Sequence, residues 1–180
     1  LYLREMVVDY LIPYGELRSG QVFSIKTNKL QNFQVKPTDE DLCDWGPFYQ
    51  IINVANTVLN NAHKARANDR TYKMEEMNAH FCEAYFLRAL SYFYLVRNWR
   101  DVPLITVPFE DDSYSYHVPK ATEDSIISQI KADIRAALAT GAAKEYYETT
   151  WETKGRATRW ALYALMADVC LWSEDYNTAI

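Results

Sequence analysis

Apolar residues recur at helical spacing in five stretches of the chain, which indicates a mostly helical protein. The first stretch covers residues 1–14 and places on one side Leu3, Met6, Val7, Tyr10, Leu11 and Tyr14. The second covers 45–67, with Pro47 at a first-turn position where its missing N–H costs nothing. The third covers 72–98 and spaces small alanines among aromatic residues, a pattern that lets a partner helix approach closely.

The remaining stretches have recognisable start and stop signals. We expect the polar break at 68–71 to cap the third helix and Thr122 to cap the fourth, whose isoleucines share one face. Gly141 can end the fourth helix in the left-handed conformation. The fifth helix is expected from about Thr158, and a further helix from 175 to the last residue. Segments 15–40 and 99–120 are expected to be irregular, apart from a strand-like run at 102–107, and 142–157 is expected to be a linker.

This order of elements predicts an all-α fold of tetratricopeptide-like stacked helix pairs with long irregular loops. The third and fifth helices can be aligned at an offset of about 77 residues, which pairs Ala84 with Ala161 and Leu90 with Ala167. Two helix-turn-helix units of roughly 34 residues each, together with the insert at 99–120, would account for that offset.

Composition narrows the classes of function. The 180 residues are 49% hydrophobic and carry a net charge of −5, which argues against a nucleic-acid partner. No apolar run reaches the roughly 18 residues of a membrane span. The three cysteines (Cys43, Cys82 and Cys170) and the three histidines are scattered, so neither a metal site nor a cofactor is predicted.

Both ends of the chain fall inside periodic apolar patterns. Leu1 has no cap before it and Ile180 has no stop signal, so we expect a fragment truncated at both ends. Any secretion signal or lipid-anchoring cysteine would then lie upstream of Leu1.

Four sequence blocks with characteristic spacing occur in order along the chain. The first is W-x-x-x-Y-x-x-I-x-x-A-N, from Trp45 to Asn56. The second is E-A-x-F-L-R-A-L-x-Y-F-x-L-V-R from Glu83, followed by D-V-P-L at 101–104. The third is P-x-A-T at 119–122 with I-x-x-D-I-x-x-A at 130–137, and the fourth begins with G-R-A-T at 155–158. The four blocks in this order resemble the SusD/RagB family of outer-membrane nutrient-binding lipoproteins. Arg100 departs from the family, which usually has glycine there, and Cys170 stands where an aromatic residue is common.

The resemblance implies that residues 1–180 are the N-terminal, tetratricopeptide-like part of a SusD-like protein. Such a protein would be lipid-anchored on the outer surface of a Bacteroidetes-type outer membrane. It would capture an oligosaccharide for a SusC-like TonB-dependent transporter, as part of polysaccharide utilization, without chemistry of its own. The helices would serve mainly as scaffold and transporter contact.

Sugar binding in water needs flat aromatic faces beside planar polar groups. The loop at 14–38, where the family often contributes binding residues, and the segment 111–116 offer the candidates Tyr14, Arg18, Phe23, Asn28, Phe33, Tyr114 and Tyr116. A third aromatic group is Tyr146, Tyr147 and Trp151. The alternatives are a surface loop that packs its phenylalanines inward, and tyrosines that face the transporter.

Other charged residues are expected to be structural. Glu83, Arg88 and Asp133 lie in aromatic or apolar helix faces, where a charge usually pairs with another group. The acidic run 110–112 is interpreted as a solvated turn rather than a calcium site or a catalytic carboxylate pair.

Two other functional classes remain open at this point. A tetratricopeptide-type protein–protein scaffold without sugar binding needs only the helices, but it would not carry the D-V-P-L insert. A glycoside hydrolase needs two converging carboxylates, which the sequence does not indicate. We therefore expect a binding protein and not an enzyme.

Overall fold

The computed structural model describes residues 34–36, 38, 43–110 and 117–179. The chain divides into two compact units, Leu1–Trp45 and Gly46–Ile180. In the described part of the first unit, the Cys43 thiol donates a hydrogen bond to the Lys36 carbonyl over 3.4 Å. The helix expected at 1–14 and most of the loop expected at 15–40 lie outside the described residues.

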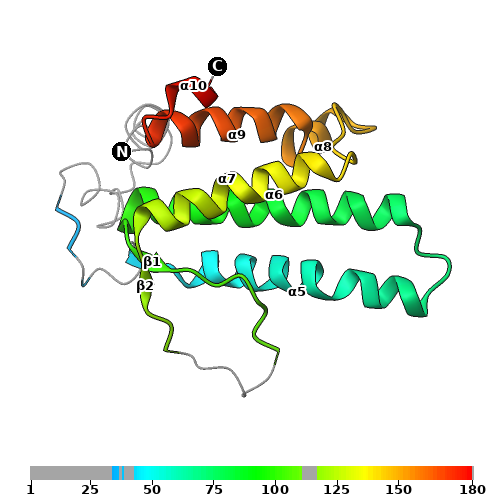
Figure 1. Cartoon of the computed structure of the whole chain (residues 1–180), viewed down its shortest axis with the longest axis horizontal. Coiled ribbons are helices and arrows are strands. Elements are labelled where there is room, and N and C mark those ends of the chain that lie inside the picture. Colours follow the sequence, from blue (N-terminus) through cyan, green and yellow to red (C-terminus); the bar gives the residue numbers. More distant parts are fainter. Residues whose placement is uncertain (1–33, 37, 39–42, 111–116, 180) are drawn as a thin grey trace, which may run out of the picture. The chain divides into compact units, whose positions relative to one another are not determined.

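The second unit is a set of long helices that lie side by side (Figure 1). Helix α5 spans Gly46–Asn68, and α6 spans Met74–Trp99 and returns antiparallel to α5 after a short turn. Helix α7 spans Glu123–Ala139 and packs on α6, while α9, Arg159–Trp172, packs mainly on α7. This all-α arrangement of neighbouring helices confirms the predicted tetratricopeptide-like fold class.

Helix α6 supplies much of the core because α5 and α7 both pack against it. Its aromatic and aliphatic residues Tyr92, Leu95 and Val96 are fully buried. The isoleucine face predicted for the fourth helix is buried as well, with Ile126, Ile130 and Ile134 fully buried in α7. The spacing of these residues by three and four positions explains why one face of each helix is apolar.

The cap predicted for α7 is correct, and α9, for which only a start near Thr158 was predicted, begins with the same kind of cap. The Thr122 hydroxyl accepts a hydrogen bond from the Ser125 amide, and the Thr158 hydroxyl accepts one from the Ala161 amide. Gly141 has φ 68°, the left-handed conformation that the sequence predicted after α7.

The predicted cap of α6 is wrong. The helix begins at Met74, and its N-cap residue is Lys73, whose amide donates to the Glu76 carboxylate over 3.1 Å. The Asp69 carboxylate instead accepts hydrogen bonds from the amide and hydroxyl of Thr71, over 2.8 and 2.7 Å. Because this turn satisfies Asp69 locally, the carboxylate is not used to cap the helix.

Two short strands close the insert between α6 and α7. Strand β1, Val102–Pro103, pairs antiparallel with β2, Lys120–Ala121, so that Val102 lies opposite Ala121. Only the first two residues of the strand-like run at 102–107 are in a sheet. The insert therefore leaves and returns to the helices at one place (Figure 1).

The segment 142–157 is not only a linker. It contains α8, Thr150–Gly155, whose N-cap Thr149 accepts a hydrogen bond from the Glu152 amide. No residue of α8 is buried. The sequence of α8 therefore shows no apolar periodicity from which the helix could have been predicted. After α9, the helix expected near the end is present as α10, Tyr176–Ala179.

Candidate functional site

The candidate sugar-binding residues of the loop 14–38 and the segment 111–116 lie outside the described residues. They stay predictions, and they are Tyr14, Arg18, Phe23, Asn28, Phe33, Tyr114 and Tyr116. The structure does describe the scaffold that holds the insert on both sides of 111–116, and the third aromatic group.

One face of α5 binds the backbone of the insert. The Tyr49 hydroxyl donates to the Pro103 carbonyl over 2.6 Å, and the Asn53 side-chain oxygen accepts from the Phe109 amide over 2.8 Å. The side-chain amide nitrogen of Asn56 donates to the backbone carbonyls of residues 105 and 107, each over 3.1 Å. Tyr49, Asn53 and Asn56 follow helical spacing, so this face of α5 fixes the path of the extended segment 103–109.

A buried network of charged and polar side chains contacts the face of α5 that binds the insert. Arg88 on α6 is 5% exposed, and its guanidinium donates to both carboxylate oxygens of Asp133 on α7. Its third donor group, Nη1, lies 2.6 Å from the Asn56 side-chain oxygen. Gln129 donates to the same Asp133 carboxylate over 2.8 Å. The expectation that Arg88 and Asp133 pair for a structural purpose is confirmed.

Tyr92 completes the network on the insert side. Its hydroxyl donates to the Ile105 carbonyl over 2.9 Å and accepts from the Ile105 amide over 2.7 Å. Burial raises the pKa of Tyr92 to about 12, and burial also raises the pKa of Tyr49. In the described part of the chain, every buried side-chain nitrogen and oxygen has a hydrogen-bond partner.

Sequence reasoning missed the role of Tyr49, Asn53 and Asn56 in binding the insert. A signal was present, because Asn56 lies in an otherwise apolar helix face, at the end of the first resemblance block. An asparagine buried in such a face needs a partner, and here the partners are 49 and 51 residues away.

The three residues of the third aromatic group differ in their exposure and contacts. Tyr146 and Trp151 are each 75% exposed, so their ring faces are open to solvent. Tyr147 is held instead: its hydroxyl donates to the Ala157 carbonyl over 2.8 Å and to the Glu83 carboxylate over 3.2 Å. The Arg156 guanidinium lies 4.2 Å from the centre of the Tyr147 ring and pairs with Glu83. Glu83 is therefore structural, as expected.

Helix α9 adds two exposed aromatic residues near this group. Trp160 and Tyr163 are both exposed and meet edge to face, with ring centres 6.3 Å apart. The start of α9 lies beside the segment that carries Tyr146, since the Arg159 amide donates to the Lys144 carbonyl over 2.7 Å. We call Tyr146, Trp151, Trp160 and Tyr163 the aromatic surface. The exposed rings of these four residues are available for stacking against a ligand.

The described residues offer little that could carry out chemistry. They contain no group of three or more His, Cys, Asp or Glu side chains placed to hold a metal ion. Within the same part of the chain, none of the helices is both long and apolar enough to cross a membrane. Glu110, from the acidic run, accepts a hydrogen bond from the Asn61 side chain on α5, and the rest of the run, 111–112, lies outside the described residues.

Comparisons with known proteins agree with the order of the sequence blocks. Residues 16–171 match the SusD-like family described as starch-binding and associating with the outer membrane. A SusD-like protein of Bacteroides ovatus is 28% identical over 172 residues, which cover 93% of this chain and 29% of that protein. SusD-like protein P2 of Formosa agariphila is 31% identical over 135 residues, covering 75% of this chain and 25% of the relative.

A solved structure of a laminarin-binding SusD-like protein is also similar. Its TM-score is 0.69 and its identity 29%, and the match covers 85% of this chain and 31% of that one. The chain thus spans less than a third of the length of each of these three proteins.

Proposed function

This chain belongs to the SusD-like family, and we propose that its protein is the glycan-binding component of an outer-membrane nutrient uptake system. The observation that carries the proposal is the family match over 16–171, together with a similar solved protein that binds laminarin. The protein would capture an oligosaccharide and would not cleave it. Residues 1–180 would serve mainly as scaffold and as the contact with the transporter.

We propose that the sugar contacts come from aromatic and polar side chains on loops. The first candidates remain Tyr14, Arg18, Phe23, Asn28, Phe33, Tyr114 and Tyr116. The hydrogen bonds from α5 and α6 to residues 103–109 support a role for the insert, because a binding loop needs fixed ends. Tyr146 and Trp151 are further candidates, since an open ring face can stack on the apolar face of a sugar.

We further propose a lipid anchor upstream of this sequence and a SusC-like TonB-dependent transporter as the partner. Membership of the family supports both, and they would complete the uptake system to which a surface glycan binder would deliver its ligand. Fractionation of the outer membrane, followed by co-purification of the transporter, tests this part separately from glycan binding.

Glycan binding itself is tested by affinity electrophoresis in gels that contain starch, laminarin or xyloglucan. The proposal predicts that at least one glycan slows migration and that added oligosaccharide reverses the effect. The competing function is a tetratricopeptide-type protein–protein scaffold, which the stacked helices alone would suit. Unchanged migration in all three gels would favour the scaffold.

A further inference from the structure

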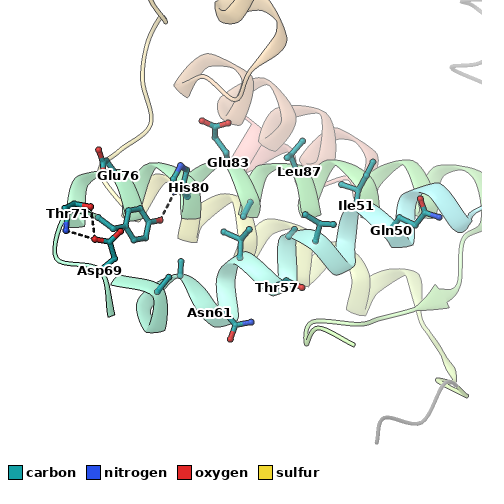
Figure 2. Close-up of a pocket in the computed structure, with 17 residues that line it drawn as sticks. Gln50, Ile51, Thr57, Asn61, Asp69, Thr71, Glu76, His80, Glu83 and Leu87 are labelled. Atoms are coloured by element: carbon teal, nitrogen blue, oxygen red, sulfur yellow. Dashed lines mark hydrogen bonds between the residues drawn. The ribbon is translucent and has the colours of Figure 1, made fainter. Parts of the chain in front are cut away.

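Helices α5 and α6 enclose an open groove of about 1160 Å³ on the side of the pair that Figure 2 shows. Apolar side chains line one half of it, and three of them are exposed: Val54 is 64% exposed, Leu87 45% and Ile51 42%. Ile51 and Val54 lie one turn apart on α5, and Leu87 lines the groove from α6. These three residues are distinct from those that bind the insert and from the four residues of the aromatic surface.

The groove has the dimensions of a helix-binding site. Its lining along α5 extends from Gln50 to Ala65, about 22 Å at 1.5 Å per residue, which matches a helix of about fifteen residues. Alanines 55, 62 and 65 on α5 and Ala84 on α6 line it as well. Small residues at helical spacing let a third helix approach closely, while Val54 and Leu87 provide the flanking contacts.

The apolar half of the lining disfavours a sugar as its occupant, although Gln50, Asn61, Tyr72 and His80 also line the groove. A sugar needs hydrogen-bonding groups beside an apolar face, but the Thr57 hydroxyl already donates to the Asn53 carbonyl of its own helix over 2.9 Å. The apolar half of the groove therefore suits a helix, because the backbone N–H and C=O groups of a helix are already hydrogen-bonded within it.

The other half of the groove is acidic. Asp69, Glu76 and Glu83 line it, and none of the described lining residues is lysine or arginine (Figure 2). The Glu83 charge is offset by Arg156, so Asp69 and Glu76 carry the negative charge at the end beside the α5–α6 turn. The hydrogen bonds from Thr71 lower the pKa of Asp69, which keeps its carboxylate ionised at neutral pH.

We propose that this groove binds one amphipathic helix of a separate partner polypeptide, with a basic residue at the end that meets Asp69 and Glu76. The apolar side chains of that helix cover Ile51, Val54 and Leu87. A second copy of this chain fits poorly, because it adds a net charge of −5 and the same acidic groove end. The partner is defined by charge complementarity and by the length of the groove.

The proposal is tested with a designed peptide of sixteen residues that has a leucine face and two lysines at one end. A matched peptide carries two glutamates in place of the lysines, and binding is followed by fluorescence anisotropy. We expect the lysine peptide to bind at least tenfold more tightly. Glu76→Gln combined with Asp69→Asn should remove most of that difference. Equal affinity of the two peptides for the unmodified protein would overturn the proposal.

A groove variant and a surface variant separate docking from nonspecific adhesion. Val54→Asp should weaken binding of the lysine peptide at least tenfold, while Val107→Asp, at an exposed apolar position of the insert, should leave it unchanged. Circular dichroism checks that both variants keep their helices. Equal binding by Val54→Asp, competition by a glycan, or a photo-crosslinker at position 54 of the full-length protein that reacts only within its own chain would each contradict the proposal.

Discussion

Arg88 and Asp133, which lie 45 residues apart in the sequence, form a two-pronged ion pair inside the helical unit. The Nε–Oδ2 distance is 2.8 Å and the Nη2–Oδ1 distance is 2.6 Å. Because the same guanidinium also reaches Asn56, one side chain on α6 connects α5, α7 and, through Asn56, the insert. The scaffold and the insert are therefore stabilised together.

Removing one charge of this pair should destabilise the protein strongly. Asp133→Asn leaves the buried Arg88 without its counter-ion, and we expect a loss of about 3–5 kcal/mol in the free energy of unfolding. Asp168→Asn is the matched control, since that exposed carboxylate pairs with Arg97 at 3.3 Å and should contribute less than about 1 kcal/mol. Urea denaturation measures both, and equal losses would contradict the structural role of the network.

Tyr92 should control the local stability of the insert. Tyr92→Phe removes both hydrogen bonds to Ile105. The backbone amide hydrogen of Ile105 should then exchange with solvent at least about tenfold faster. Hydrogen exchange followed by NMR measures this, with Tyr163→Phe on the surface of α9 as the control. Unchanged exchange at Ile105 would show that the tyrosine does not hold the segment.

The same residue predicts a loss of stability at alkaline pH. The pKa of Tyr92 is about 12 in the folded protein and about 10 in the unfolded chain, so the unfolded state releases its proton first. The contribution of Tyr92 is complete below pH 10 and is lost as the pH rises from about 10 to 12. Denaturation at several pH values should show a smaller decline for Tyr92→Phe, and an identical decline would contradict this assignment.

Local signals explain what the sequence could predict of the fold. The isoleucine face of α7, its Thr122 cap and its Gly141 stop depend on neighbours within a few residues, so each was predicted correctly. Helix α8 was missed because none of its residues is buried. Lys73 was missed because lysine is not a typical cap residue.

The site was less predictable because its contacts are distant in the sequence. That Asp133 needs a partner followed from its apolar surroundings, but that the partner is Arg88 did not. The groove between α5 and α6 depends on how two helices pack, so the pattern of either helix alone could not show it. The block from Trp45 to Asn56 signalled the family, yet its role in binding the insert needed the coordinates of both segments.

Arg100 provides a test of one of the two departures from the family pattern. Its φ is 63°, a region that favours glycine, and its side chain pairs with Glu123 at 2.8 Å. Both Arg100→Gly and Arg100→Ala lose that ion pair, but only glycine relieves the backbone strain. We expect the glycine variant to be about 1 kcal/mol more stable than the alanine variant. Thermal unfolding compares them, and an alanine variant of equal stability would contradict the argument.

The aromatic surface makes a separate prediction for glycan binding. If Trp151 stacks on a sugar, Trp151→Ala should weaken binding about fivefold, or roughly 1 kcal/mol. Leu171→Ala removes an exposed apolar side chain of α9 and serves as the control. Affinity electrophoresis compares the two variants, and equal retardation would restrict the sugar contacts to other loops.

The most direct test of the central claim, binding without cleavage, measures both on one sample. The full-length protein is titrated with laminarin oligosaccharides, and with starch and xyloglucan oligosaccharides in parallel, in a calorimeter. Reducing ends in the recovered solution are then counted over several hours. The account predicts saturable heat with at least one glycan and a constant number of reducing ends. No binding to any of the three, or reducing ends that increase with time, would contradict it.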